Sequence, residues 1–544
     1  MYPGKVGRDH LGLGSVSSDQ ILPYLSPGIN VLTFHPRYHS FYVFLLDEFW
    51  RREVPRTHAN WVNFYRPREF VFSIGAHLCN HPEHGLMQNV VGARITQALA
   101  AEKPERYSTA THYIDSPLGG YGLYYRSVMA EMGLILPGGP GYPLPLDVPS
   151  ELGKRVAEAF RSAIRDTAYY RNYFTCDAPD VPANVIEDYI SRACLCQLKK
   201  PTAADRAPLL DVFIHCGPPA EAKSRRATLR LLLDVADQTE GNAVDEDTFR
   251  QLLYFRAAEG GLAYQPKAEV SDEFRMWRLY QAREYYAFAL NAMWTYLCVW
   301  GIASGGNVSP VPIDAVWQHL DQTLTFDSLA TTLSVKRPRL TADSSFRSLL
   351  AWLVEACHGN EESFDTDCTL ASRVHEHRLY RLALGNRANP AFMVAGMLVV
   401  LALIYLRFRH PDCHQRPEWR IAQMGSDGRL SIDNFVRLLE SRLASGPVTI
   451  REVARWLYGE YVILQHQLVA TNKLPDNTFR FRRESRGLRF YSLLNVLGFN
   501  DARYNALRTT LLDLGLCGNM LEPAHPLTAD GREMLNTGDL AWTR

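Results

Sequence analysis

The chain of 544 residues has no excess of charge of either sign, because 58 Lys and Arg stand against 58 Asp and Glu. No overall field therefore favours nucleic acid or an anionic membrane, and any such activity needs a local patch. The chain also lacks long polar, Gln/Asn-rich or Gly/Ser-rich tracts, while 47% of its residues are hydrophobic. This composition indicates a folded protein rather than a disordered one.

Targeting features are equally sparse. The first 20 residues have neither the apolar core nor the small-residue cleavage site of a secretory signal, and the ten cysteines are scattered, so we expect a cytoplasmic protein. One long apolar run, "AFMVAGMLVVLALIYL" (391–406), is shorter than the roughly 20 residues that cross a bilayer, and no second run is visible. We predict that it is a helix buried on all sides, without a membrane partner.

Complete catalytic motifs are missing as well. Ser127 has no flanking glycines at the spacing of a nucleophile elbow, and no acid-x-Lys pair of the kind that metal-dependent nucleases use follows Asp211 at a convincing spacing. No fixed-period repeat defines a solenoid. These absences favour a non-catalytic protein.

Helical patterns dominate what is present. Residues 35–52, 150–174 and 272–302 carry apolar side chains at helical spacing, and Pro36 and Pro67 stand where helices could begin. Gly/Pro-rich segments at 115–149 and 301–312 indicate domain boundaries. We predict a mainly α, multi-domain fold with an N-terminal helical domain (1–149), a central helical domain (150–303), a helical domain with the buried apolar helix (304–428) and a last domain (429–544).

The last domain changes character. Gly446-Pro447 separates two helical segments, and Thr449 and Glu452 have the spacing of a capping box. "NTFRFRRE" and "GLRFYSLL" alternate apolar and charged residues around a short turn, which predicts a β-hairpin. A helix that ends at Gly515 follows. This order resembles a winged-helix module, which implies an α+β domain at the C-terminal end.

"HLCNHPEHG" (77–85) contains four residues that bind metals. Zinc is bound by Cys sulfur and His nitrogen, so His77, Cys79, His81 and His84 are candidate ligands, with zinc as the possible cofactor. A metal-dependent hydrolase or nuclease could use this cluster with a remote acid such as Asp211, which we expect on a strand. The alternative is a histidine-rich helix end followed by a turn, because cationic side chains favour helix C-termini. Cys194 and Cys196 are less promising, since two residues apart on a helix they point to different sides.

A basic cluster in the last domain indicates a second kind of site. Arginines on a hairpin beside a basic helix suit contact with DNA phosphates. The alternative is a solvated surface or one that binds an acidic protein. The candidate DNA-binding residues are Lys473, Arg480, Arg482, Arg483, Arg486, Arg489, Arg503, Asn505 and Arg508.

"LSPGINVLTFHPRYHSFYVFLLDEFW" near the start and "QHQLVATNKLPDNTFRFRRE" near the end resemble uncharacterised bacterial proteins of multi-gene phage-defence loci. The resemblance implies a non-catalytic subunit that works with a helicase, nuclease or ATPase. Three hypotheses therefore stand: an adaptor or DNA-binding subunit of such a complex with double-stranded DNA as a possible partner, a metal-dependent hydrolase, and a purely structural interaction scaffold.

Overall fold

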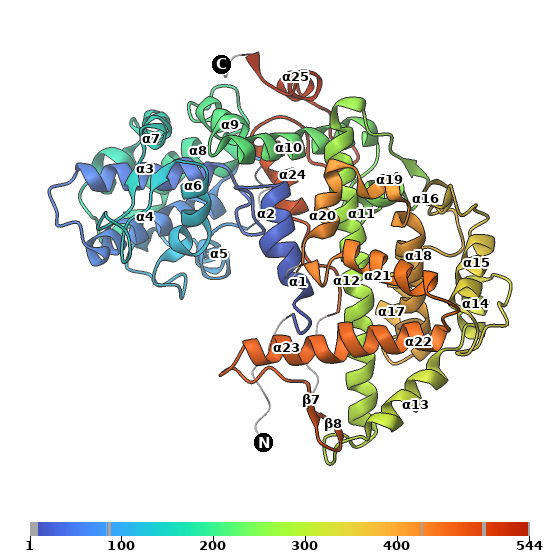
Figure 1. Cartoon of the computed structure of the whole chain (residues 1–544). Helices are drawn as coiled ribbons and strands as arrows, with labels where there is room; N and C mark the ends of the chain where they lie inside the picture. Colours follow the sequence, from blue (N-terminus) through green and yellow to red (C-terminus); the bar gives the residue numbers. More distant parts are fainter. Residues whose placement is uncertain (1–8, 83, 85–88, 426–427, 492–496, 542–544) are drawn as a thin grey trace. The chain divides into compact units, whose positions relative to one another are not determined.

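The computed structural model describes residues 9–82, 84, 89–425, 428–491 and 497–541. Helices make up 61% of the chain and strands 5%, so the predicted mainly α fold is confirmed. Two compact units divide the chain (Figure 1). Unit 1 comprises Met1–Leu22, Asp247–Gln265 and Ser271–Asn500, and unit 2 comprises Pro23–Glu246, Pro266–Val270 and Asp501–Arg544.

These units are not the four consecutive segments that we expected from the sequence. Each unit is assembled from three stretches of chain, and one crossing lies at the first residue of α11 (Glu246–Phe255). The Gly/Pro-rich segments 115–149 and 301–312, which we expected to be boundaries, each lie inside one unit and do not mark a crossing.

Unit 1 is built around the long helix α12 (Ser271–Ala303), against which α18 (Gly396–Phe408) packs (Figure 1). Its other helices are α1 (Leu13–Val16), α11 from Asp247 onward, α13 (Ile313–Thr323), α14 (Asp327–Leu333), α15 (Phe346–Ala356), α16 (Phe364–Asp367), α17 (Glu376–Gly385), α19 (Pro411–His414), α20 (Arg420–Gln423), α21 (Ile432–Ala444), α22 (Ile450–Trp456) and α23 (Gln465–Asn472). Shorter π and 3-10 segments are η1 (Ser17–Ile21), η7 (Ala391–Ala395), η8 (Pro417–Trp419) and η10 (Leu457–Leu464).

The apolar run occupies the core of unit 1. Residues Ala391–Phe408, which form η7 and α18, are completely buried, as predicted. A second helix, Ala268–Ala303, is also long and apolar enough to cross a membrane, although 72% of its most apolar window is buried. We predicted this helix from its periodicity but did not identify it as a second long apolar run, because charged residues interrupt its apolar pattern. Both helices are compatible with a soluble protein, and the cytoplasmic location stays a prediction.

Unit 2 contains α2 (Leu22–Leu25), which begins at its border, and a body of longer helices. They are α3 (Arg37–Arg51), α4 (His58–Leu78), α5 (Ala93–Glu102), α6 (Arg126–Glu131), α7 (Glu151–Ile164), α8 (Ala183–Ala193), α9 (Arg206–His215), α10 (Pro219–Thr239), α24 (Tyr504–Asp513) and α25 (Ala529–Thr537). Shorter segments are η3 (Tyr121–Tyr125), η4 (Tyr170–Phe174), η5 (Leu195–Gln197) and η6 (Ala268–Val270).

The helix starts expected at Thr449 and Pro36 are confirmed, whereas the one expected at Pro67 is not. The Thr449–Glu452 capping box is present at the start of α22, and Pro36 precedes α3 as predicted. Pro67 does not begin a helix, however, because it lies inside α4, whose first residue follows the capping side chain of Thr57. The buried face of α4 outweighs the loss of one backbone hydrogen bond at Pro67.

In the part of the chain that the structure describes, the strands form four two-stranded antiparallel sheets. The pairs are β1 (Arg106–Ser108) with β4 (Asp180–Pro182), β2 (Ile135–Leu136) with β3 (Val148–Pro149), β5 (Ala257–Ala258) with β6 (Leu262–Ala263), and β7 (Phe481–Glu484) with β8 (Gly487–Phe490).

The β7–β8 pair is the predicted hairpin, but the predicted winged-helix module around it is not confirmed. The hairpin belongs to unit 1, whereas α24 and α25 belong to unit 2. Leu488 pairs with Val311, and Phe490 packs so closely on Gly301 that a Cβ atom there would lie 2.4 Å from the Phe490 ring. The apolar face of the hairpin is thus buried against the end of α12 and the segment after it.

Candidate metal centre and basic hairpin

The candidate metal centre forms where two helices of unit 2 end side by side. Gly75 lies in the last turn of α4, and a Cβ atom there would be 3.1 Å from both Ile186 and Ile190 of α8. A side chain at this position would require the two isoleucine side chains to shift by a few tenths of an ångström, so glycine suits the close contact of the two helices. The residues that follow the two helix ends, Cys79 and Cys194, are consequently brought together.

Four ligand atoms gather at this place. The sulfur atoms of Cys79, Cys194 and Cys196 and a ring nitrogen of His84 all lie within 4.8 Å of one another. Cys79 Sγ is 3.7 Å from Cys196 Sγ, and Cys194 Sγ is 3.2 Å from His84 Nδ1. A tetrahedral zinc ion with Zn–S bonds of about 2.3 Å separates two sulfur ligands by roughly 3.8 Å, so the spacing suits such an ion.

The backbone explains how the Cys-x-Cys pair converges. The helix α8 ends at Ala193, and Cys194 is extended, with φ −57° and ψ 146°. The 3-10 turn η5 then places Cys196 on the same side as Cys194. Our expectation that two residues two apart diverge assumed a continuing helix, and that assumption was wrong.

The surroundings of the cluster favour a bound cation. The C-terminal ends of α4 and α8 carry partial negative charge, which stabilises a cation between them. Gln197 Nε2 donates a hydrogen bond of 3.2 Å to Cys196 Sγ, the kind of outer contact that orients a metal ligand. Cys194 and Cys196 are buried, while Cys79 and His84 are half-buried. Hydrogen bonds from Cys194 and Cys196 hold the pKa of the Cys79 thiol well below its usual range.

Two of the four ligands predicted from the sequence belong to this group, and two do not. Cys79 and His84 take part, whereas His77 and His81 lie outside the four-membered group among the described residues. His77 instead lines a groove of about 580 Å³ with Tyr107 and Glu187. Asp211, expected on a strand, lies on α9 and is not a member of the group.

The predicted DNA-binding residues fall into two sets. Lys473 to Arg489 lie in unit 1, and Arg503, Asn505 and Arg508 lie in unit 2, so they do not form one module. In unit 2 the guanidinium of Arg503 is buried and donates to the carbonyl oxygens of Ser26 and Ile29. Arg508 donates to Asn505 at 3.0 Å, and burial lowers the pKa of Arg508.

In unit 1 three of the predicted residues are engaged by the protein itself. Lys473 donates to the Asp9 carbonyl at 2.9 Å, Arg480 is only 2% exposed, and Arg489 pairs with Glu484 at 2.9 Å. The other three residues, Arg482, Arg483 and Arg486, are exposed around the tip of the hairpin. Among the described residues they have no ion-pair partner. These three form the basic hairpin tip.

Comparisons with known proteins found no relative of this chain. No protein-family model, no curated protein and no solved structure matches the chain.

Proposed function

We propose that the protein is a zinc-binding, non-catalytic adaptor, in which one Zn²⁺ fastens the loop after α4 to the end of α8. The observation that carries the proposal is the convergence of Cys79, His84, Cys194 and Cys196. Thiolate sulfur and imidazole nitrogen are the ligands that zinc takes in structural sites of the Cys₃His type. Soft thiolates also disfavour magnesium and calcium at this place.

The number of protein ligands favours a structural role over hydrolysis. Catalytic zinc sites use three protein ligands and keep the fourth position for water or substrate, whereas four protein ligands close the tetrahedron. The group contains no carboxylate to act as a general base. The hydrolase hypothesis therefore gains no support from this geometry.

Elemental analysis of protein purified without a His tag or added metal tests the proposal. We expect about one zinc per chain in the wild type and in Cys176→Ser, whose cysteine is exposed and outside the group. Cys194→Ser and His84→Ala should lose the zinc, whereas His81→Ala should retain it. A folded wild type without zinc would contradict the proposal, as would a Cys79–Cys196 disulfide found by mass spectrometry in protein isolated under reducing conditions.

A second function, contact with DNA through the basic hairpin tip, is favoured by the exposure of Arg482, Arg483 and Arg486. Arginine side chains without a carboxylate partner are free to contact phosphates, and a short hairpin presents them together. Their number suits a modest, sequence-independent affinity. Membership of a phage-defence complex with a helicase, nuclease or ATPase stays a prediction of the sequence resemblance.

A further inference from the structure

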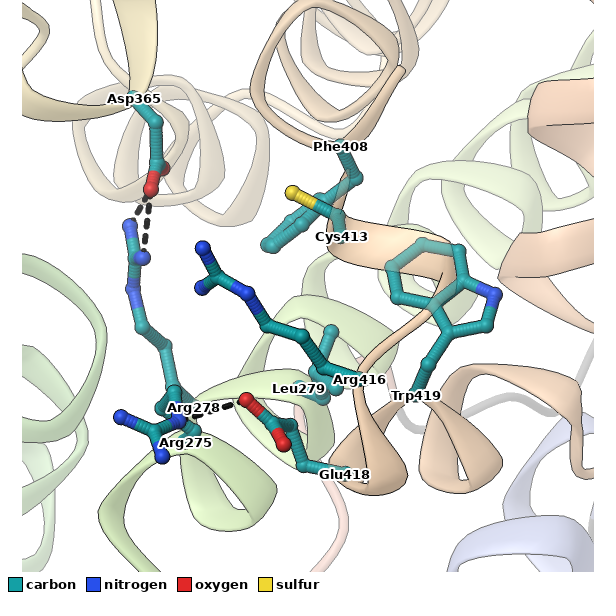
Figure 2. Close-up of a pocket in the computed structure, with 9 residues that line it drawn as sticks. All are labelled: Arg275, Arg278, Leu279, Asp365, Phe408, Cys413, Arg416, Glu418 and Trp419. Carbon is teal, nitrogen blue, oxygen red and sulfur yellow. Dashed lines mark hydrogen bonds and ion pairs between the residues drawn. The ribbon is translucent and has the colours of Figure 1, made fainter. Parts of the chain in front are cut away.

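We propose a second binding site, in unit 1, that takes the phosphate group of a small molecule. The site is a pocket lined by Arg275, Arg278 and Leu279 of α12, Asp365 of α16, Phe408 at the end of α18, and Cys413, Arg416, Glu418 and Trp419 from the segment that follows α18 (Figure 2). Three guanidinium groups therefore border one cavity.

Two of the three arginines are held in place by carboxylates. Arg278 binds Asp365 through both terminal nitrogens, at 2.7 and 2.5 Å, and its Nε donates to the Tyr254 carbonyl at 3.0 Å. Arg275 Nε lies 2.5 Å from Glu418 Oε1. Such paired guanidinium groups are oriented before a ligand arrives, and each retains N–H groups beyond those that its carboxylate uses.

The third arginine has no such partner. Figure 2 shows the Arg416 side chain extending into the pocket between Cys413 and Glu418, toward Arg278. Its guanidinium makes no hydrogen bond or ion pair with any described residue. Arg416, Arg278 and Asp365 line this pocket together with Cys413. Burial raises the pKa of the Cys413 thiol, and the charge of Asp365 raises it further while those of Arg416 and Arg278 lower it.

The local charge balance favours an anion. Burial lowers the pKa of Arg256, which does not line the pocket, and the positive charges of Arg278 and Arg275 lower it further against the attraction of Asp365. Asp365 and Glu418 are already paired. Of the three guanidinium groups that line the pocket, that of Arg416 thus remains without a paired acid, and a phosphate group could bind it together with the remaining N–H groups of Arg275 and Arg278.

The size of the pocket limits the ligand. The cavity volume is about 50 Å³, and one water requires roughly 10–15 Å³ on this measure, so about three to five water-sized groups fit. This matches a tetrahedral oxyanion. A larger ligand would place only its phosphate here, because the Trp419 ring is 2% exposed and already stacked by His414 at a centroid distance of 4.4 Å.

Isothermal titration calorimetry with inorganic phosphate, with adenosine monophosphate as a phosphomonoester, and with acetate tests the site on the full-length metal-loaded protein. We expect one saturable phosphate site per chain, with phosphate or the monoester bound at least ten-fold more tightly than acetate. The ratio of the phosphate and monoester affinities shows whether a free or an esterified phosphate is preferred.

Variants locate the site. Arg416→Gln should weaken phosphate binding at least ten-fold without unfolding the protein, because Arg416 is exposed and holds no other residue. Arg337→Gln, a matched change at an exposed arginine of unit 1 outside the pocket, should leave binding unchanged. Cys194→Ser should also bind phosphate normally, so failure of the zinc proposal and failure of this one are distinguishable. No saturable binding by the wild type, equal binding by Arg416→Gln, or acetate bound as tightly as phosphate would overturn the inference.

Discussion

Cys194 Sγ lies 3.2 Å from His84 Nδ1, although 110 residues separate them in the chain. The two residues belong to different helix ends, because Cys194 directly follows α8 and His84 follows the end of α4. An ion shared by them and by Cys79 and Cys196 would cross-link two distant segments of unit 2. Such a link restricts the unfolded chain in the way that a disulfide does.

Removal of zinc should therefore lower the thermal stability of unit 2. A loss of about 3 kcal/mol corresponds to a decrease in Tm of about 6–12 °C for a unit of this size. Differential scanning calorimetry before and after dialysis against a chelator measures the change. Cys194→Ser provides the control, because a protein that holds no zinc should show no response to the chelator. An unchanged wild-type Tm after complete removal of zinc would contradict a stabilising role.

At the metal centre, two of the four ligands could be predicted from the sequence and two could not. Cys79 and His84 were recognisable because both lie in one short His/Cys segment, and the end of α4 before Asn80 was expected from Pro82. Cys194 and Cys196 were set aside because the helical pattern before them suggested a continuing helix. Only the turn at Cys194 and the close packing at Gly75 bring the second pair to the first, and neither depends on the local sequence alone.

The C-terminal part was predicted incompletely for the same reason, because long-range packing cannot be predicted from the local sequence. The alternation of Phe479, Arg480 and Phe481 correctly indicated a hairpin, because period-two patterns reflect a half-buried strand. It did not indicate the partner of the buried face, which is the end of α12 in unit 1. Arg480 is buried rather than exposed for this reason. Packing between segments that are remote in the sequence determines both the surface that the hairpin covers and the burial of Arg480.

Unit 2 should lose stability in mild acid through His39. Burial lowers the pKa of His39 from 6.5 to about 4, with a hydrogen bond to the Pro36 carbonyl acting in the opposite sense and Arg225 lowering it further. The unfolded chain therefore binds a proton first as the pH falls. The contribution of neutral His39 to the free energy of unfolding is fully present above pH 6.5. It declines by about 3 kcal/mol in total as the pH falls to 4.

His39→Gln tests this because glutamine does not titrate. Urea unfolding at pH 7 and pH 4.5 should show a smaller pH-dependent loss of unfolding free energy in the variant than in the wild type, whatever its absolute stability. His58→Gln, at an exposed position, should behave like the wild type. Equal pH-dependent losses in His39→Gln and the wild type would mean that His39 does not titrate on unfolding in this range.

The stability of unit 1 should depend strongly on the ion pair between Arg407 and Glu376. Arg407 Nε lies 2.6 Å from Glu376 Oε1, and the two side chains are 1% and 0% exposed. Glu376→Gln removes the closer of the two carboxylates that Arg407 pairs with and leaves Asp365 Oδ1 at 3.6 Å from Nη1, so the loss should approach the cost of about 3–5 kcal/mol for breaking a buried ion pair. Glu355→Gln removes a partner of Lys336 at a surface pair with side chains 62% and 80% exposed, and should cost less than about 1 kcal/mol. Urea denaturation of the two variants compares them, and similar losses would refute the difference in burial as the cause.

The basic hairpin tip should set the salt dependence of any DNA binding. Replacement of Arg482, Arg483 and Arg486 by Gln removes three candidate phosphate contacts while leaving the buried Arg480 in place. Each lost contact reduces the slope of log K against log[salt] by about 0.9, so the triple variant should lower it by about 2–3. Fluorescence anisotropy of a labelled duplex over a series of NaCl concentrations measures the slope. Neutralising the exposed Arg337, Arg339 and Arg387 of the same unit removes equal charge elsewhere and should change the slope much less. If both triple variants changed it equally, net charge rather than the hairpin would govern the interaction, and a wild type without duplex binding would remove the DNA function altogether.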